Sequence, residues 1–356
     1  MVAGAFCVKS SHLKASKAVS RHGFGPSLAL AGLLCGLGGL VQAEDLAAAN
    51  SAEGVAQLLQ AQQQTGGLQD LLPTALQPGA VIQLPASMAH VLVADLERNR
   101  LHLYHHTDGQ LQLLNSMFLS IGKAGYGKQV EGDNLSPVGI YTITSWLSGE
   151  SLPPLYGDGA WPVDYPNSLD RFEGRTGHGI WLHGNPPESD HGKRAARSSE
   201  GCLTLANADL TSLTPFIELQ RTTVIFADQV NWISPAERLA NQRLVNQLLE
   251  QWQVAWETLD AEELGAFYAP NSRISGLSRE QFVAQKRDVN SRKDWIKLQL
   301  SELVAYRYPG GPAPRLMLRS QQDSRSSNYS SRGQKRQYWQ QQPDGQWKIL
   351  LEENLG

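Results

Sequence analysis

The sequence predicts a mainly β domain with long loops, followed by an α+β cone and preceded by a short helical region. Three observations predict this architecture. The chain has 356 residues, which exceeds one core, since domains average about 150 residues. Short alternating apolar segments separated by Gly, Pro, Asn and Asp fill residues 89–230. Residues 236–356 begin with helical periodicity and end with four strand-like segments.

The first residues resemble an export signal. A basic stretch extends to Arg21, an apolar run covers residues 28–41, and Ala43 completes a small-residue cleavage site. The apolar run of 14 residues is shorter than the roughly 20 that a membrane-spanning helix needs. We therefore predict a cleaved signal peptide over residues 1–43 and a mature protein in the periplasm.

Charge and cysteine content narrow the function classes. Removing residues 1–43 leaves 27 basic residues against 34 acidic ones, a formal charge of −7. A mildly acidic chain without a basic block offers no surface for nucleic acid, so this class is excluded. Cys202 is the one cysteine of the predicted mature chain, so it forms no internal disulfide. An unpaired thiol in an oxidising compartment indicates either burial or a use for the thiolate.

The domains are justified in order along the chain. Residues 44–88 are rich in Ala, Gln and Leu at helical spacing, which predicts one or two helices outside the main domains. The β domain, residues 89–230, contains four clear predicted strands at 90–95, 101–104, 111–114 and 223–226.

The second domain, residues 236–356, opens with a helix over residues 237–252. The spacing of Leu239, Leu244, Leu248 and Trp252 predicts that they share one helical face. Two shorter helical segments and a strand meander follow, and residues 320–334 are predicted to form a polar hairpin loop. The shorter helical segments are 261–268 and 279–287, and the strands are 298–304, 315–319, 335–339 and 347–351.

The residues that point to chemistry lie in two short segments. Apolar alternation before His183 predicts a strand that carries this side chain at its end. Cys202 follows Gly201, whose freedom would let nearby N–H groups face a developing oxyanion. A thiolate is a strong nucleophile, and a histidine within about 3 Å can take its proton. The pattern predicts acyl transfer.

These segments resemble the YkuD family of L,D-transpeptidases. The motif of that family is His, a spacer of 14–17 residues, Ser or Thr, then His-Gly-Cys. Here 15 residues separate His183 from Ser199, and Glu200 stands where many members have a second histidine. This matches the Ser-x-Gly-Cys subgroup. Residues 128–141 and 164–170 also resemble family segments, so the likeness covers about residues 89–228 and implies a β-sandwich with long loops.

The resemblance also assigns roles. It implies that Cys202 is the nucleophile, that His183 donates and accepts protons, and that Gly201, Ser199 and Gly184 serve the oxyanion or the substrate. It implies no cofactor and no metal. The region after residue 236 is similar to the SnoaL-like cone, the nuclear-transport-factor-2 fold. The pair of domains resembles the helical-cell-shape determinant family, in which a domain of the YkuD type acts as an L,D-carboxypeptidase.

We therefore expect an L,D-transpeptidase that acts on peptidoglycan tetrapeptide stems through a Cys202 thioester. One alternative is an L,D-carboxypeptidase that trims tetrapeptides to tripeptides. Another is a non-catalytic protein that binds a glycan, a small ligand or a partner through the cone. A metal site is disfavoured, because His178, His183, His191 and Cys202 lack the usual ligand spacing.

Several smaller questions stay open at this stage. Residues 44–88 either pack on a second copy, giving a homodimer, or brace the catalytic sheet. Ser199 serves either the substrate or the loop backbone. His178 and His191 are expected to be structural or to face solvent. Glu200 is expected to be solvated, although a carboxylate there would alter the pKa of the thiol.

Overall fold

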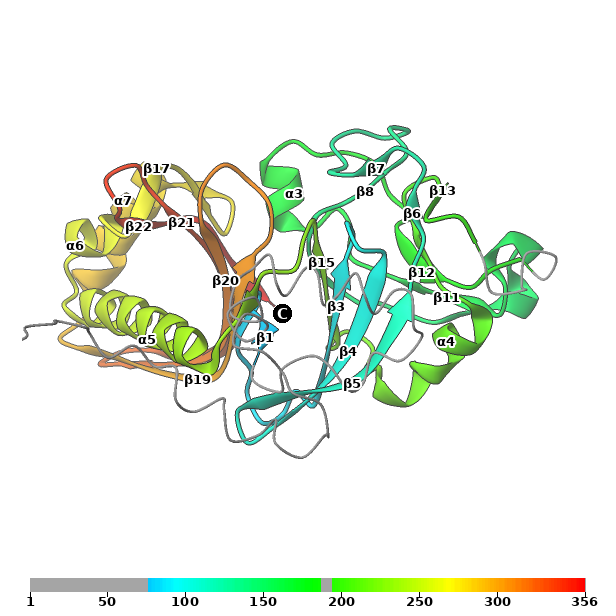
Figure 1. Cartoon of the computed structure of the whole chain (residues 1–356). Coiled ribbons are helices and arrows are strands. Elements are labelled where there is room, and N and C mark those ends of the chain that lie inside the picture. The colour runs from blue at the N-terminus through cyan, green and yellow to red at the C-terminus, as the bar shows by residue number, and fades with distance from the viewer. Residues whose placement is uncertain (1–75, 187–193, 356) are drawn as a thin grey trace, which may run out of the picture. The chain divides into compact units, whose positions relative to one another are not determined.

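The computed structural model describes residues 76–186 and 194–355 (Figure 1). The predicted fold class is confirmed: a mainly β domain with long loops is followed by an α+β cone. The central sheet of the first domain has the strand order β5-β4-β3-β15-β9, in which β3 and β15 are parallel neighbours. Its strands are β3 (His90–Asp95), β4 (Arg100–Thr107), β5 (Gln110–Phe118), β9 (Gly139–Thr142) and β15 (Thr223–Ala227).

Two smaller four-stranded sheets complete the first domain. One has the order β10-β11-β12-β14 and the other β13-β6-β7-β8. The strands of the first are β10 (Leu147–Ser148), β11 (Gly159–Pro162), β12 (Trp181–His183) and β14 (Leu203–Thr204). Those of the second are β6 (Ile121–Gly122), β7 (Gly125–Tyr126), β8 (Leu135–Ser136) and β13 (Arg197–Ser199). The helices are η1 (Gly149–Ser151), η2 (Pro154–Tyr156), α3 (Ser168–Phe172), α4 (Asn207–Ser212) and η4 (Thr214–Phe216).

One apolar core holds the central sheet and the motif-bearing sheet together. It includes Leu92 and Val224 from the central sheet with Leu182 and Leu203 from β12 and β14, all almost fully buried. The strands that carry the candidate site therefore rest on a packed interior, which holds their ends in place.

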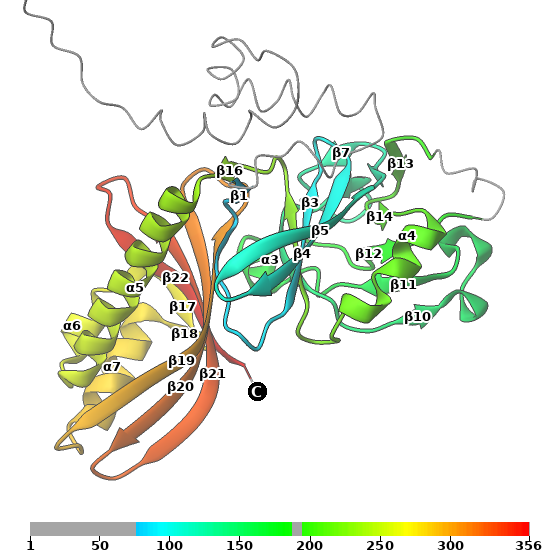
Figure 2. The same ribbon diagram turned by 60° about the horizontal axis from the view of Figure 1, so that its bottom comes forward.

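The cone is a seven-stranded sheet with helices on one face (Figures 1 and 2). Its strand order is β18-β17-β22-β21-β20-β19-β2. Ser234 and Glu237 form a capping box, and Pro235 occupies the first turn, so the long helix begins two residues before the predicted start at residue 237. The helices are α5 (Pro235–Glu257), α6 (Ala261–Gly265) and α7 (Arg279–Asn290). The strands after α5 are β17 (Tyr268–Ile274), β18 (Leu277–Ser278), β19 (Ile296–Tyr308), β20 (Arg315–Ser326), β21 (Ser330–Gln341) and β22 (Trp347–Leu355).

The prediction of helix is wrong for the described end of residues 44–88. Instead of helix, the chain forms β1 (Gln77–Pro78), paired with β16 (Trp232–Ile233), and β2 (Val81–Gln83). β2 joins the cone sheet beside β19, and Val81 and Ile82 are fully buried there. Tertiary pairing therefore decides the conformation of this short apolar run, whose periodicity is ambiguous. The predictions of a signal peptide and of helices over residues 44–75 lie outside the described residues.

Two details of the predicted cone are also wrong. Residues 320–334 are not a loop but most of a β-hairpin, in which β20 and β21 pair continuously from Arg315–Gln340 to Arg325–Ser330. Polar side chains on both faces of this hairpin hide its strand period from the sequence. Leu239 is 51% exposed and does not share the buried face of α5, whereas Leu248 and Trp252 do.

The cone sheet and the central sheet of the first domain share a further core. Val93 and Ile225 from the central sheet pack in the same cluster as Tyr306 and Tyr338 from the cone. Polar contacts add to it at the start of α3, where the Asn167 amide donates to the Tyr308 hydroxyl at 2.9 Å. No described helix is long and apolar enough to span a membrane.

Two leucines on α5 test which face of this helix packs inside the cone. We expect Leu248→Ala to lower the free energy of unfolding by about 2–5 kcal/mol, because it opens a cavity in the cone core. Leu239→Ala changes the same residue type on the same helix at an exposed position and should cost less than about 0.5 kcal/mol. Chemical denaturation measures both values, and equal losses would contradict this assignment of the helix faces.

Candidate functional site

Strand register brings the two motif residues to the same face of their sheet. β12 and β14 are parallel neighbours, with Leu182 opposite Leu203 and His183 opposite Thr204. Opposed residues in a sheet project to the same side, and so do residues two apart along a strand. Cys202 precedes Thr204 by two residues, so its side chain emerges on the face that His183 occupies. The sequence prediction that a strand ends at His183 is confirmed.

The His183 ring is held in one orientation. Its Nδ1 lies 2.7 Å from the carbonyl oxygen of Gly184, which can only accept, so Nδ1 carries the hydrogen. Its Nε2 therefore has the free lone pair and lies 3.3 Å from the Thr204 hydroxyl. The Tyr156 ring packs edge-on against the imidazole at a centroid distance of 5.0 Å. The nitrogen that could act as a base is thus Nε2.

The Cys202 sulfur lies beside the start of β12. The Trp181 backbone N–H donates to it, and the thiol lies 3.3 Å from the carbonyl oxygen of Gly179. Within the described residues no hydrogen bond joins this sulfur to the His183 ring. Such bonds are often long before substrate binds, so proton transfer requires the thiol to turn from Gly179 towards Nε2.

Burial sets the protonation states of this pair. It raises the pKa of the Cys202 thiol, an effect that the Trp181 N–H, Arg194 and Lys128 oppose. Burial also lowers the pKa of His183 to about 4, aided by the charge of Arg194 and opposed by the Gly184 hydrogen bond. The resting site at neutral pH therefore holds a thiol and a neutral imidazole rather than an ion pair.

The loop before Cys202 is fixed from within. The Ser199 hydroxyl donates to the Cys202 carbonyl oxygen at 2.6 Å and accepts from the Gly201 N–H at 3.2 Å. Gly201 has φ +129°, and a Cβ there would lie 2.9 Å from the Leu135 carbonyl oxygen. Ser199 thus braces the backbone, and the Gly201 N–H already has a partner.

Gly184 is also occupied as a donor. Its N–H donates to the carbonyl oxygens of Tyr156 and Gly159, each at 3.1 Å. A Cβ at this position would lie 2.0 Å from the Asn207 side-chain oxygen, so only glycine fits. The hydrogen bonds of the described residues leave the Cys202 N–H unengaged. Of the N–H groups near the predicted oxyanion, that of Cys202 is therefore the one with no other acceptor among the described residues.

The segment over residues 128–135 packs beside this loop. Lys128 forms a buried ion pair with Asp133 at 2.7 Å, and the same carboxylate accepts from the N–H groups of Gln129 and Val130. Although burial opposes it, these partners lower the pKa of Asp133 to about 2. The carboxylate thus organises the turn that presents Leu135 to Gly201.

Two further residues from the sequence analysis, Glu200 and His178, are exposed to solvent. The side chain of Glu200 is 85% exposed, 3.4 Å from Lys123, in agreement with a solvated residue. His178 is exposed and lies 3.5 Å from Glu131. His191 lies outside the described residues. The described residues contain no group of three His, Cys, Asp or Glu side chains able to hold a metal ion.

Three neighbours of the site escape sequence reasoning. Tyr156 comes from η2, far from the motif in sequence, and its ring packs against those of Trp181 and His183. Thr204 is part of the motif region, but its contact with Nε2 follows only from the strand register. Arg194 lies in the spacer between His183 and Ser199, and nothing in the composition of that spacer points to a role for it. Its charge acts on both His183 and Cys202.

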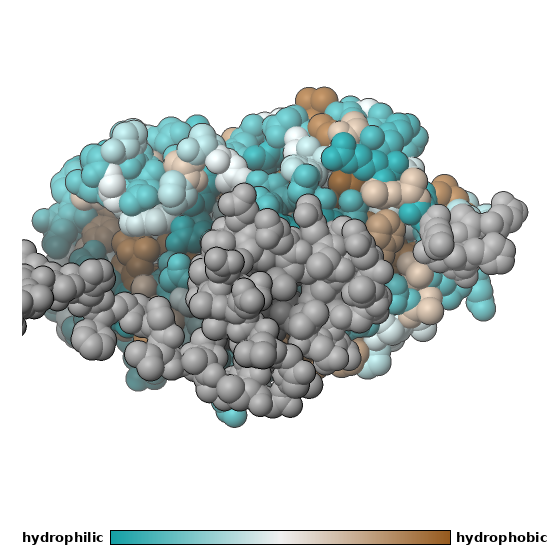
Figure 3. Space-filling view, viewed as in Figure 1, coloured by the Kyte–Doolittle hydropathy of each residue, from teal (hydrophilic) through white to brown (hydrophobic). Residues whose placement is uncertain are grey.

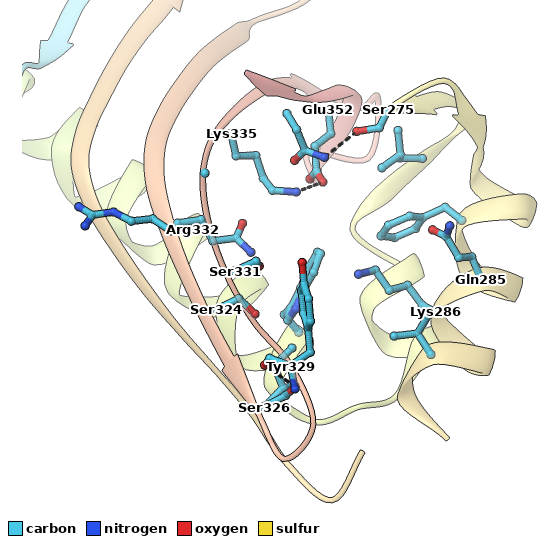
Figure 4. Close-up of a pocket in the computed structure, with 18 of the residues that line it drawn as sticks. Ser275, Gln285, Lys286, Ser324, Ser326, Tyr329, Ser331, Arg332, Lys335 and Glu352 are labelled. Atoms are coloured by element: carbon cyan, nitrogen blue, oxygen red, sulfur yellow. Dashed lines mark hydrogen bonds and ion pairs between the residues drawn. The ribbon is translucent and has the colours of Figure 1, made fainter. Parts of the chain in front are cut away.

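A separate cavity of about 570 Å³ lies inside the cone. Lys335 projects from β21 and pairs with the buried Glu352, while Lys286 projects from α7 on the opposite wall (Figure 4). The Lys286 ammonium lies 3.8 Å from the centre of the Trp256 ring and pairs with no carboxylate among the described residues. Burial, together with Lys335, lowers the pKa of Lys286 to about 8. Figure 3 shows apolar surface recessed among hydrophilic surface where Figure 1 draws α5, α6 and α7.

Comparison with known families agrees with this geometry. The model of the L,D-transpeptidase catalytic domain, YkuD, matches residues 89–226, which carry both motif residues. The chain contains a YkuD domain. The model of the Cds6 C-terminal NTF2-like domain matches residues 244–353, the cone. The YkuD domain makes this protein a peptidoglycan-acting enzyme of the L,D-transpeptidase and carboxypeptidase kind.

Solved structures with the same pair of domains are similar to this chain. Bd1075 of Bdellovibrio bacteriovorus is 28% identical with a TM-score of 0.69, over 78% of this chain and 98% of that one. The helical cell shape determining protein Pgp2 of Campylobacter jejuni is 25% identical with a TM-score of 0.65, over 78% of this chain and 96% of that one. No curated protein matches the chain. The likeness therefore spans the YkuD domain and the cone together.

The protonation states predict how Cys202 of the YkuD domain reacts with iodoacetamide. Since burial raises the pKa of the thiol above its ordinary value of 9.0, the alkylation rate should be low at neutral pH and still rise beyond pH 9. Peptide mass mapping follows the modification at Cys202, with the urea-unfolded chain as the control for an ordinary thiol. A rate that levels off below pH 7 would show a preformed thiolate and contradict this assignment.

Proposed function

We propose that this protein is a Cys202-dependent L,D-carboxypeptidase that trims peptidoglycan tetrapeptide stems to tripeptides and thereby sets cell shape. The observation that carries the proposal is the shared face of Cys202 and His183 inside a YkuD domain. The choice of water as acceptor rests on the resemblance to the helical-cell-shape determinant family, whose domain of the YkuD type acts as an L,D-carboxypeptidase. The likeness along both domains to Pgp2, a helical cell shape determining protein, supports the role in cell shape. Transpeptidation, which the sequence favours, uses the same residues and is the second candidate.

The first step forms a thioester. The Cys202 thiol gives its proton to Nε2 of His183 as the sulfur attacks the carbonyl carbon at the L-centre of the third stem residue. The Cys202 N–H donates to the oxygen that becomes negative. Nε2 then protonates the amine of the terminal D-residue, which leaves as a free amino acid.

The second step releases the product. Water gives a proton to Nε2 and attacks the thioester carbonyl carbon, and the sulfur leaves and regains the proton as a thiol. The balance is one water consumed, one tripeptide stem and one D-amino acid released. An amine in place of water gives a cross-link instead. Because the resting pair is neutral, each proton moves only as its bond forms or breaks.

The substrate class agrees with a periplasmic location, which we propose together with cleavage of the signal peptide over residues 1–43. A homodimer through residues 44–88 stays a prediction. Within that segment the described strand β2 already pairs with the cone sheet of its own chain.

Product analysis tests the proposed reaction. We expect purified mature protein to convert a disaccharide tetrapeptide into a disaccharide tripeptide and free D-alanine, detected by mass. Cys202→Ala should abolish turnover without unfolding the chain, and His183→Ala should lower the rate about 10²–10⁴-fold through loss of the proton carrier.

The products separate the candidates. Linked dimers would establish transpeptidation. If the wild-type protein forms neither product, or if Cys202→Ala keeps its activity, the enzymatic mechanism proposed above is wrong.

The cone supports a second binding function, because Lys286, which forms no ion pair among the described residues, places a positive charge over Trp256 inside a large cavity. We propose that it binds an anionic glycan or peptide portion of the wall. Calorimetry with disaccharide tetrapeptide and Cys202→Ala protein should show this binding. Adding Lys286→Met should weaken it at least about tenfold, since a charge-assisted contact is lost.

Lys297→Met is the matched control for the cone. This lysine pairs with Glu257, is 71% exposed and does not line the cavity. An equal loss in both variants, or no loss in Lys286→Met, would show that the cavity does not hold the ligand.

A further inference from the structure

Arg194 lies between the segments that carry the two motif residues. Its Nε donates to the Ser198 hydroxyl at 2.6 Å, and its Nη1 lies 3.4 Å from the Asn185 side-chain oxygen. Ser198 belongs to β13, four residues before Cys202, and Asn185 follows His183 by two residues. Asn185 is buried, and Ser198 is held by Ser120 at 2.7 Å. The guanidinium is therefore held by fixed partners on both sides of the site.

Among residues 76–186 and 194–355, no carboxylate pairs with Arg194. Two cations act on the Cys202 sulfur, Arg194 and Lys128. Lys128 is neutralised by Asp133 at 2.7 Å. Arg194 contacts only neutral oxygens among the described residues, and its Nη2 has no hydrogen bond there. A half-buried guanidinium with an unused N–H edge is a ready partner for a carboxylate.

We propose that Arg194 binds the terminal carboxylate of the stem peptide and so restricts cleavage to the last peptide bond. The inference rests on the proposed function and deepens it. With the scissile carbonyl at Cys202, the carboxylate of a terminal residue lies only about 4 Å further along the peptide. One additional residue moves that charge about another 3.5 Å away and leaves a neutral peptide group at Arg194.

The geometry also explains why an arginine suits this place. The planar fork can keep its Nε contact with Ser198 while Nη2 donates to the incoming carboxylate. The other cation that acts on Cys202, Lys128, is already paired with Asp133, and the exposed Glu200 in the motif is negative. Recognition of the terminal charge therefore depends on Arg194.

Two substrates that differ only in charge test the inference. The disaccharide tetrapeptide is compared with its C-terminal amide, as kcat/KM for release of D-alanine or D-alaninamide. We expect the wild-type protein to prefer the free acid at least about tenfold, as a charge-assisted contact allows. Arg194→Gln should lower the rate for the acid at least about tenfold more than the rate for the amide.

Arg197→Gln is the matched control, since Arg197 is an exposed arginine three residues away. It should keep the wild-type preference for the acid. A merely structural role of Arg194 would lower both rates by the same factor, and that result would overturn the inference. An acid preference that persists in Arg194→Gln would overturn it too.

Recognition of the terminal carboxylate can also be tested with the wild-type protein alone. If Arg194→Gln fails to fold, inhibition by free D-alanine against D-alaninamide measures the same preference without a variant. Equal treatment of acid and amide would refute carboxylate recognition. Failure of the proposed function is a different result, in which the wild-type protein cleaves neither substrate.

Discussion

The parallel pairing of β12 with β14 is the constraint on which the rest of this protein depends. It sets His183 opposite Thr204 and places Cys202, two residues before Thr204, on the same face. A shift of one residue would turn either the sulfur or the imidazole into the core, because side chains alternate along a strand. Leu182 and Leu203 fix the register, since both occupy the buried face and pack against the central sheet.

Around that pairing, polar atoms serve mainly to hold the backbone. Ser199, Gly184 and Asp133 all form hydrogen bonds with the backbone of nearby loops. The groups left for chemistry are the Cys202 sulfur and N–H and Nε2 of His183. Burial keeps both reacting groups neutral at rest. In the periplasm that we propose, this protects the thiol from oxidation, because the reactive thiolate forms only when substrate is attacked.

The sequence predicts most of the strands, the long helix of the cone and the pair Cys202 and His183 because each leaves a local pattern. It does not predict β2 or the polar hairpin, whose pairing depends on distant partners. It suggests oxyanion roles for Ser199, Gly201 and Gly184, yet Ser199 and Gly201 bond within their own loop, and the Gly184 N–H bonds to Tyr156 and Gly159, which the motif does not include. Arg194 has no motif around it, so its place beside the site follows only from the structure.

The central claim is that Cys202 carries the acyl group during turnover. Acid quenching of the mature protein during reaction with a tetrapeptide stem, followed by intact mass measurement and peptide mapping, tests it most directly. The account predicts one tripeptide-stem adduct per chain, attached to Cys202 and released by hydroxylamine as a thioester should be. Turnover with no adduct at this residue, or with an adduct at another side chain, would contradict it.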